Sequence, residues 1–532
     1  MAVPAKVNRL GPALLLLLVG ATPLRAQTPI DSNWDPALAS AVYTTALAFM
    51  APRILEPVAL SQLTLWGLRG LTALDPALAI ELRDGQLVLL SGGSVLAAIA
   101  PPAVSEAPPV QAPPKAWADL AVALAGIARD ASPTVRRAGT AGVLRSFFDE
   151  LFNHLDPYSR YVPPTDAAED RARRSGRAGA GVTLISQNGA SQHGTVIVAS
   201  VIADGPGALA GLRPGDRVVS VDGQSSAGQS AAIVAGWIEG PEDTTVQITL
   251  SGRGARAREV EILRALVPPE TVFAERRGEI FLLRVTGFNN RTDARLTREL
   301  ERGTARLSVT GARPAAGIVI DLRGNRGGLV REAVAVADEW LPAGIVAIAA
   351  GRNPEADRIW RSFQPKLLIT LPVVVLVDGR SASAAEIVAA ALADRGRAVV
   401  VGSVTQGKGL VQTIAQLPDG GELFVTWSRL LAPLGWPIQG LGVLPQVCTS
   451  LGADNLQRQL ANLANGNQLM ADALTRHREA RAPIPPAQAL AIRATCPAAE
   501  GRDGDMEAAK FLIGHSAAYA RALMPTFTGL PP

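Results

Sequence analysis

Residues 371–402 decide the class of fold and read LPVVVLVDGRSASAAEIVAAALADRGRAVVVG. The β-branched run at 371–378 is apolar, which is typical of a strand buried on both faces of a parallel sheet. Small and apolar residues then predict a helix that begins near Ser383, and a second β-branched run follows at 397–403. Strand, helix and strand in succession indicate an α/β core.

The α/β pattern extends over residues 267–450. GIVIDLRGNRGG (317–328) indicates a buried strand followed by a glycine loop, and LVREAVAVADEWL (329–341) indicates an amphipathic helix. Upstream, residues 176–266 hold short β-branched runs bounded by glycine turns, which predicts a compact β-rich module. The sequence from 451 to 532 is expected to form a helical C-terminal tail.

The sequence before the β-rich module is expected to be mostly helical. We predict a helical region at 27–99, a proline-rich linker at 100–115 (APPAVSEAPPVQAPPK) and a further helical segment at 116–175. The chain of 532 residues is therefore predicted to be a multidomain protein of mixed α+β and α/β class.

The first 26 residues have the composition of a secretory signal. Lys6 and Arg9 precede an apolar run at 10–20, and Ala26 ends a cleavage site. We therefore expect a cleaved signal peptide and an exported, periplasmic protein. An uncleaved membrane anchor is the alternative, although the run is shorter than the roughly 20 residues that a span needs. Peripheral association with a membrane and oligomerisation both stay open.

Charge and cysteine content limit the classes of partner. Without the three basic residues of the leader, 48 basic residues stand against 47 acidic ones, so no nucleic-acid surface is expected. The sequence implies no metal and no organic cofactor. In an oxidising compartment Cys448 and Cys496 could form a disulfide that joins the C-terminal region to the core. Two unconnected buried thiols are the alternative.

The stretch GSVTQGKGLVQ (402–412) is similar to a phosphate-binding loop, with Gly407 and Lys408 in the expected order. Such a loop needs Ser or Thr after the lysine and then a helix. Gly409 follows instead, and the next residues alternate as in a strand. Nucleotide binding is therefore the weaker interpretation of this lysine.

A catalytic role for Lys408 rests on its chemistry. The chain has five lysines among 51 basic residues, so a lysine between two glycines indicates a site where arginine will not serve. Lysine can lose its proton when burial lowers its pKa, and arginine cannot. Ser383 lies at a sharp turn from a strand into a helix, where free amides can stabilise negative charge. None of the four histidines lies in a glycine-rich part of the α/β core, which leaves Lys408 as the candidate base.

Each of these residues, taken alone, also has a simpler explanation. Ser383 and Glu386 form the S-x-x-E pattern of a helix capping box. Lys408 alone could be a solvated charge on a loop. The combination of both residues with the glycine loop and the β-rich module favours catalysis over these alternatives.

Six motifs together resemble the carboxy-terminal processing proteases, also called tail-specific proteases. They are LDPYSRY, GAGVTLI, GLRPGDRVVSVDG, VIDLRGNRGGLVREAVAVADEWL, VVVLVDGRSASAAEIVAAALADRGRAVVVG and QGKGLVQ, and they cover roughly residues 120–450. The resemblance implies a crotonase-like α/β protease core at 267–450, a PDZ-like domain at 176–266 and a Ser-Lys catalytic dyad. It leaves residues 28–115 and those after about 480 unexplained.

The resemblance assigns catalytic roles within the core. Ser383 would be the nucleophile and Lys408 the general base, while Gln412 would orient the lysine. Glu386 would help to position Lys408.

The resemblance also implies two oxyanion donors. One would be the amide of Ala384, and the other would come from the glycine loop, at Gly327 or Gly328. The sequence departs from the family pattern at Ala385, where serine is frequent, and at Arg326, where proline is frequent. Neither departure removes a catalytic group.

The PDZ-like domain is expected to capture the C-terminal tail of a substrate. The backbone of Ala180, Gly181 and Val182 would bind the terminal carboxylate, and the strand that follows would pair with the tail. A β-rich spacer without a ligand is the alternative. We therefore predict a serine endopeptidase that acts on proteins or peptides with apolar C-terminal tails. A non-catalytic PDZ-type adaptor on the same fold is the alternative function.

Overall fold

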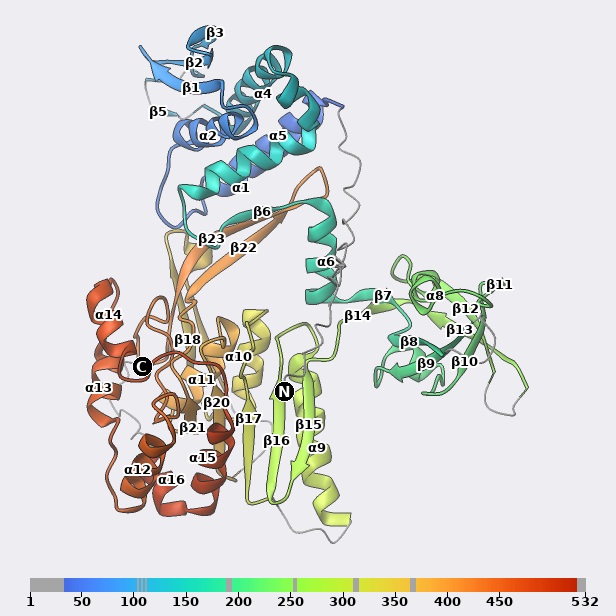
Figure 1. Ribbon diagram of the computed structural model, residues 1–532, viewed down its shortest axis with the longest axis vertical. Helices are drawn as coiled ribbons and strands as arrows, with labels where there is room; N and C mark the ends of the chain where they lie inside the picture. Colours follow the sequence, from blue (N-terminus) through green and yellow to red (C-terminus); the bar gives the residue numbers. More distant parts are fainter. Residues whose placement is uncertain are drawn as a thin grey trace, which may run out of the picture.

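The computed structural model describes residues 33–102, 105–106, 109–110, 112–187, 194–251, 256–309, 315–363 and 370–523. The expected signal peptide at 1–26 lies outside the described residues. Within the described ranges, no helix is both long enough and apolar enough to cross a membrane. Figure 1 shows a column made of the N-terminal region, a long β-hairpin and the α/β core, with a separate β-rich domain projecting from its side.

A six-stranded sheet forms the centre of the α/β core. Its order is β15-β16-β17-β20-β21-β24, and all neighbouring pairs except β15–β16 are parallel. Every residue of β20 (Val373–Val377) is buried, because alternate side chains such as Val374 and Val375 enter two different hydrophobic clusters. The predicted strand with two buried faces is therefore confirmed. The other strands are β15 (Val272–Arg277), β16 (Ile280–Val285), β17 (Gly317–Asp321), β21 (Val399–Gly402) and β24 (Val447–Cys448).

Helices cover both faces of this sheet. α11 (Ala384–Asp394) is buried along its whole length against one face, and α10 (Val330–Asp338) packs beside it. The C-terminal tail is helical, as predicted, and part of it covers the opposite face, so it belongs to the core. The helices on that face are α12 (Ala453–Ala464), α15 (Asp503–Gly514) and α16 (Ser516–Ala522). The remaining helices of the core are α9 (Thr292–Val309), α13 (Ala471–Glu479) and α14 (Pro486–Arg493).

A second sheet joins the core to the N-terminal region. Its order is β19-β18-β23-β22, and β6 pairs with the first part of β23. β22 and β23 form the long hairpin of Figure 1, and Leu417, Leu423 and Val425 of this hairpin enter the hydrophobic cluster of the N-terminal helices. The elements are β6 (Arg160–Val162), β18 (Gly344–Gly351), η1 (Pro354–Ala356), β19 (Arg358–Ser362), β22 (Leu410–Gln416) and β23 (Glu422–Leu431).

The N-terminal region is helical only in part, so the prediction of a helical region at 27–99 is wrong for its second half. Residues 78–99 form a three-stranded antiparallel sheet. The turns Asp84-Gly85 and Gly92-Gly93 join its strands, and each of these residues has a positive φ, as tight two-residue hairpins require. The elements are α1 (Pro36–Met50), α2 (Leu60–Arg69), α3 (Leu71–Leu74), β1 (Leu78–Arg83), β2 (Gln86–Ser91), β3 (Ser94–Ile99), β4 (Ser105–Glu106), β5 (Pro109–Val110), α4 (Pro114–Ala131) and α5 (Pro133–Asn153).

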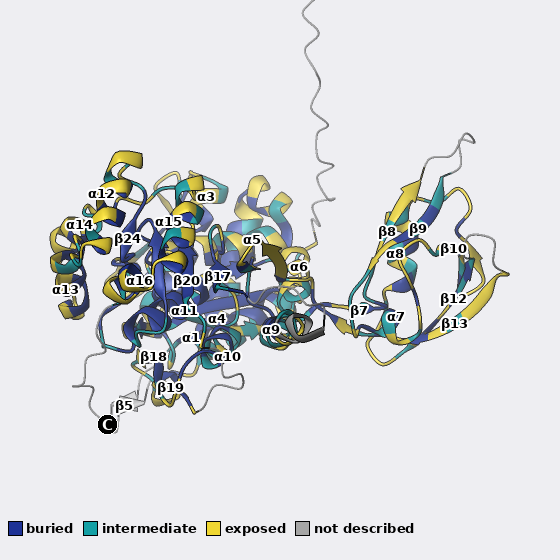
Figure 2. Cartoon of the chain, turned by 90° about the horizontal axis from the view of Figure 1, so that it is seen from below, coloured by how far each residue is buried: buried dark blue, intermediate teal, exposed yellow. Residues whose placement is uncertain are grey.

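The β-rich domain stands beside the column, as Figures 1 and 2 show. The chain enters it from α6 (Pro164–Ser175) through β7 (Arg177–Gly179) and leaves it through β14 (Ala265–Val267), which pairs with β7. Its sheet has the order β13-β12-β10-β9-β8 around a small apolar core. The elements are β8 (Val182–Gln187), β9 (Thr195–Val201), α7 (Pro206–Leu209), β10 (Arg217–Val221), β11 (Gln224–Ser225), α8 (Ala231–Ile238), β12 (Thr245–Ser251) and β13 (Arg258–Leu263).

Candidate active site

Ser383 lies at the turn between β20 and α11. It is the N-cap residue of α11 and has φ 56° and ψ −115°, a conformation that residues with a Cβ rarely adopt. Such backbone strain persists only where the surrounding structure holds it, and it is frequent at active sites. Ser383 is partly exposed, although all of the helix that follows is buried. The structure therefore places this serine on a sharp, strained turn at the end of a buried strand.

The glycine loop lies directly against Ser383. Gly327 has φ 96°, and a Cβ added to it would lie 2.8 Å from the Cβ of Ser383 and 3.0 Å from the amide nitrogen of Ala384. Gly328 has φ 146°, and a Cβ there would lie 2.1 Å from the carbonyl oxygen of Phe288. No side chain fits at either position. The fold thus brings together two loops that are well separated in the sequence.

Two amides at this junction are free to donate to a developing oxyanion. The Gly327 amide donates to Oδ1 of Asn325 at 2.8 Å and is therefore occupied. Within the part of the chain that the structure describes, the amides of Gly328 and Ala384 have no hydrogen-bond partner. Fixed backbone amides in a water-poor site stabilise negative charge strongly. The amides of Gly328 and Ala384 are therefore the better candidates for oxyanion donors. Gly327 has a different role, because its lack of a Cβ lets the glycine loop approach Ser383.

The carboxylate of Glu386 joins the nucleophile turn to the lysine loop. It is buried, and its Oε2 accepts hydrogen bonds from the amides of Ser383 (2.7 Å) and Lys408 (2.9 Å). Its Oε1 accepts from the Gly407 amide at 2.7 Å and from the hydroxyl of Thr405. Burial raises the pKa of Glu386, while these hydrogen bonds act in the opposite direction. Because one oxygen binds both amides, the backbones of Ser383 and Lys408 lie side by side.

The capping interpretation of Ser383 and Glu386 is compatible with this arrangement. The Glu386 side chain accepts from the amide of the N-cap residue, as in a capping box. The amide of Glu386 donates to the main-chain carbonyl oxygen of Ser383 at 2.8 Å. The Glu386 carboxylate therefore both caps the N-terminus of α11 and binds the lysine loop.

The glycines on each side of Lys408 allow the loop to approach neighbouring backbone. A Cβ on Gly409 would lie 2.1 Å from the amide nitrogen of Gln439, and Gly407 has φ 83°. The strand β22 begins at Leu410, directly after this loop. A phosphate-binding loop needs a helix there, so the structure contradicts the nucleotide-binding interpretation.

The side chain of Lys408 lies in a partly buried, partly aromatic environment. Its ammonium group is 4.9 Å from the ring centroid of Tyr158, a cation–π distance. Burial lowers the pKa of Lys408, and the charge of Arg160 lowers it further, while Glu386 and Asp156 oppose these effects. A lowered pKa is the property that a lysine base requires.

Gln412 lies on β22 close to this cluster, but its amide nitrogen is used elsewhere. Nε2 donates to the carbonyl oxygen of Leu410 at 3.0 Å and to Oγ1 of Thr426 at 3.1 Å. Oγ1 of Thr426 in turn donates to Oδ1 of Asp156 at 2.7 Å. The expected orientation of Lys408 by Gln412 therefore stays a prediction.

Sequence reasoning gave no role to the residues that surround the Lys408 ammonium. Asp156 and Tyr158 come from the loop between α5 and β6, and Arg160 is the first residue of β6, so all three are far from Lys408 in the sequence. The side chain of Gln439 forms a hydrogen bond with Tyr158 and accepts from the Gly409 amide at 2.9 Å. The segment LDPYSRY was the available signal, because it contains three of these residues.

A second site lies in the β-rich domain, where a cavity of about 480 Å³ separates this domain from α6. Its lining includes Ala180, Gly181 and Val182, the residues predicted to bind a terminal carboxylate. Apolar, basic and acidic side chains line the rest of the cavity, and the apolar ones suit an extended chain with an apolar end. The apolar ones include Ile202, Ala235, Ile238 and Val267, and the charged ones are Arg173, Arg177, Glu169 and Glu239.

Comparisons with known proteins match two families. Peptidase family S41 matches residues 279–449, and the PDZ domain matches residues 197–251. The first range covers the nucleophile turn, the glycine loop and the lysine loop. The second range lies within the β-rich domain.

Three curated proteins are similar to most of the chain. The carboxyl-terminal-processing peptidase 1, chloroplastic, of Arabidopsis thaliana is 31% identical over 340 residues, which are 62% of this chain and 67% of that protein. The C-terminal processing peptidase, chloroplastic, of Tetradesmus obliquus is 31% identical over 59% of this chain and 69% of its own length. The carboxy-terminal-processing protease of Bartonella bacilliformis is 32% identical over 55% and 66%, respectively. The chain thus spans about two thirds of the length of each relative.

Proposed function

The chain belongs to the carboxy-terminal processing proteases of peptidase family S41, and from this premise we propose that it is an exported serine endopeptidase with a Ser383–Lys408 dyad. The observation that carries the proposal is the buried Glu386 carboxylate, which binds the backbone amides of both residues. The leader sequence at 1–26 supports export to the periplasm. Substrates would be proteins or peptides with apolar C-terminal tails.

The chemistry begins with neutral Lys408. Its amine takes the proton of the Ser383 hydroxyl while the serine oxygen attacks the carbonyl carbon of the scissile peptide bond. The amides of Ala384 and Gly328 donate to the oxyanion that forms. The proton then passes from Lys408 to the leaving amine, and the C–N bond breaks to give an acyl-enzyme. The same lysine then takes a proton from water, which attacks the ester carbonyl carbon; the C–O bond to Ser383 breaks, and the proton returns from Lys408 to the serine oxygen.

The PDZ domain would select the substrate by its end. Backbone amides of the loop at 180–182 bind the terminal carboxylate, and the tail pairs with β8 as an added strand. The cavity lined by these residues supports this step. The scissile bond reaches Ser383 as a separate event, since the cavity and the nucleophile lie on different domains.

A cleavage assay tests the proposal. The chain from residue 27 onward is mixed with a loosely folded protein that ends in apolar residues, and products are read by mass spectrometry. Ser383→Ala and Lys408→Ala should each lower turnover by roughly 10³-fold or more while the fold is kept. Lys510→Ala, at an exposed lysine of α15, is the matched control and should leave turnover unchanged.

The same assay distinguishes an enzyme from an adaptor. Equal cleavage by wild type and by Ser383→Ala would contradict the assignment of the nucleophile. Tight binding of the tail without any cleavage by wild type would identify a PDZ-type adaptor instead.

A further inference from the structure

The segment between α14 and α15 runs across the carboxyl ends of three core strands. We call residues 496–505, which comprise most of this connection and the first turn of α15, the C-terminal strap. Cys496 at its start is bonded to Cys448 at the end of β24. Asp505, at its other end, is buried and accepts from the hydroxyl of Thr449 at 2.6 Å. The strap is therefore attached to the core at both ends.

The strap binds the turn that carries Ser383. The amide of Gly379, four residues before the nucleophile, donates to the carbonyl oxygen of Ala499 at 2.8 Å. The amide of Gly501 donates to Oδ2 of Asp378 at 3.3 Å. A Cβ on Gly379 would lie 3.0 Å from the Cβ of Ala498. The two backbones are thus in direct contact.

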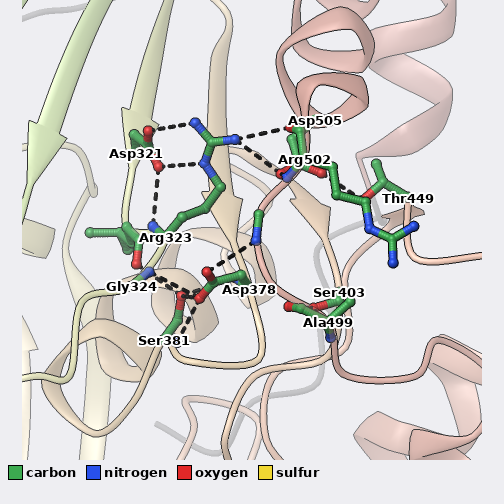
Figure 3. A network of polar contacts seen from close by, with 12 residues as sticks. Asp321, Arg323, Gly324, Asp378, Ser381, Ser403, Thr449, Ala499, Arg502 and Asp505 are labelled. Carbon is green, nitrogen blue, oxygen red and sulfur yellow. Dashed lines mark hydrogen bonds and ion pairs between the residues drawn. The ribbon is translucent and has the colours of Figure 1, made fainter. Parts of the chain in front are cut away.

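The strap also binds the glycine loop, through Arg323. Two nitrogens of this guanidinium group bind Asp321, at 2.8 and 2.7 Å. Its Nη1 donates to Oδ2 of Asp505 and to the carbonyl oxygen of Arg502, both at 3.1 Å. Figure 3 shows Arg323 between the end of β17 and the strap. A Cβ on Gly501 would lie 2.6 Å from Cδ of Arg323, so the contact leaves no free space.

Asp378 connects the three segments. Its Oδ1 accepts from the amide of Gly324 in the glycine loop (3.0 Å) and from the amide of Ser381 in the nucleophile turn (2.9 Å). Its other oxygen accepts from Gly501 of the strap. The carboxylate lies at the centre of the network in Figure 3. Movement of the strap would therefore act on both loops together.

We infer that the C-terminal strap is a positioning element of the active site, which fixes the spacing between the two loops that carry the oxyanion donors. This inference rests on the proposed function. The strap touches no reacting atom, but a donor displaced by about 1 Å can lower the rate roughly a hundredfold. Its effect should therefore appear in kcat, while docking of the tail in the PDZ domain, which lies elsewhere, should be unaffected.

Two variants disturb the contact between the strap and the loops in the full chain. Gly501→Ala places a methyl group against Arg323, at a residue whose φ is not in the left-handed region. Asp505→Asn removes the charge that pairs with Arg323. We expect kcat on a tail-bearing protein substrate to fall about tenfold to a hundredfold, with KM within about twofold of wild type.

Two controls separate positioning from stability. Gly514→Ala makes the same substitution elsewhere in the C-terminal tail, where no atom lies within 4 Å of the new Cβ. Tyr519→Phe removes hydrogen bonds between the C-terminal tail and Val373, at the end of β20 that is farther from Ser383. Both controls should keep the wild-type kcat, even where Tyr519→Phe lowers the melting temperature as much as the strap variants do.

The outcomes are distinct. Unchanged kcat in both strap variants would overturn the inference while the proposed function stands. An equal loss of kcat in Tyr519→Phe would also overturn it, because the effect would then follow stability. If Asp505→Asn does not fold, Gly501→Ala decides alone. Absence of cleavage by wild type would contradict the proposed function, and the inference would fall with it.

Discussion

At the scale of single residues, the pKa of Lys408 should set the pH dependence of catalysis. Its pKa is lowered chiefly by burial and then by the charge of Arg160. A base works in its neutral form, so activity should rise as the pH rises through this lowered pKa. The direction follows from the sign of the shift: a lower pKa moves the rise toward neutral pH.

Replacement of Arg160 should therefore move the pH profile. In Arg160→Gln the positive charge that disfavours protonated Lys408 is lost, so the pKa of Lys408 rises and the midpoint of the kcat profile moves to higher pH. Because burial is the larger cause, we expect a shift of about one pH unit or less. The measurement is kcat between neutral and alkaline pH, with the plateau expected to stay near the wild-type value.

Arg171→Gln is the matched control for this shift. Arg171 pairs with the buried Glu422 but is not among the charges that act on Lys408. Its profile should coincide with that of wild type. Equal midpoints of the kcat profiles in all three proteins would show that Arg160 does not lower the pKa of Lys408.

The residue scale also shows what the sequence could and could not predict. Ser383 and Lys408 could be identified as candidates from the sequence because each lies in a local pattern. Ser383 lies at a strand-to-helix turn, and Lys408 lies between two glycines. The contact of the Tyr158 ring with the Lys408 ammonium could not be predicted from the sequence, because only the folded chain brings the loop before β6 to this lysine. The partners of Gln412 depend in the same way on the pairing of β22 with β23.

At the scale of elements, the close approach of two loops should make one glycine indispensable for activity. Gly327→Ala adds a Cβ that would lie 2.8 Å from the Cβ of Ser383, at a φ of 96°. The loops must separate to accommodate it, so kcat should fall roughly a hundredfold or more while circular dichroism stays that of wild type. The measurement is kcat on a tail-bearing substrate.

Gly324→Ala is the matched control for the glycine loop. Gly324 also has a positive φ, 70°, but a Cβ there would meet no atom within 4 Å. It therefore has the same type of backbone strain without the contact to Ser383. Comparable losses of kcat in the two variants would mean that strain, and not the approach of the loops, accounts for the effect.

A buried ion pair should determine how firmly α11 is fixed at its far end. Asp394 accepts from Nε of Arg478 at 3.1 Å and from Nε1 of Trp436 at 2.8 Å, and both charged side chains are almost fully buried. Asp394→Ala leaves the arginine without its partner. The free energy of unfolding of the core should fall by about 3–5 kcal/mol, which calorimetry of the core transition would measure.

Asp119→Ala is the control for this loss. Asp119 forms an exposed pair with Lys115 on α4, and exposed pairs contribute little to stability. Its melting temperature should match that of wild type. A small effect of Asp394→Ala would indicate that water reaches Arg478 in the variant.

The elements also show where pattern reasoning is insufficient. β20 and α11 were predictable because a fully apolar strand and a helix of small residues each have a clear signature. Residues 78–99 are rich in apolar residues and directly follow helical segments, so composition alone does not distinguish their strands from a further helix. The turns Asp84-Gly85 and Gly92-Gly93 were the decisive evidence for strands, since positive φ at consecutive residues ends a helix.

At the scale of the whole molecule, the proposed tail-binding cavity and the candidate catalytic residues lie on different domains. The β-rich domain is joined to the column through β7 and β14, and an ion pair between Asp204 and Arg298 links it to α9. The cavity at 180–182 is lined by residues of this domain and of α6, and Ser383 is not among its lining residues. Capture of a tail and cleavage of a bond should therefore be separable by mutation.

Ala235→Trp should separate them. Ala235 lies on α8 and lines the cavity, so an indole there occupies the space that a tail would use. KM for a tail-bearing protein should rise at least about tenfold with kcat at saturation unchanged, because only ground-state binding is lost. Ala232→Trp makes the same change at an exposed position of the same helix that does not line the cavity, and KM should stay at the wild-type value. If both variants bind and cleave like wild type, the cavity is not the tail site, and substrates must reach Ser383 without it.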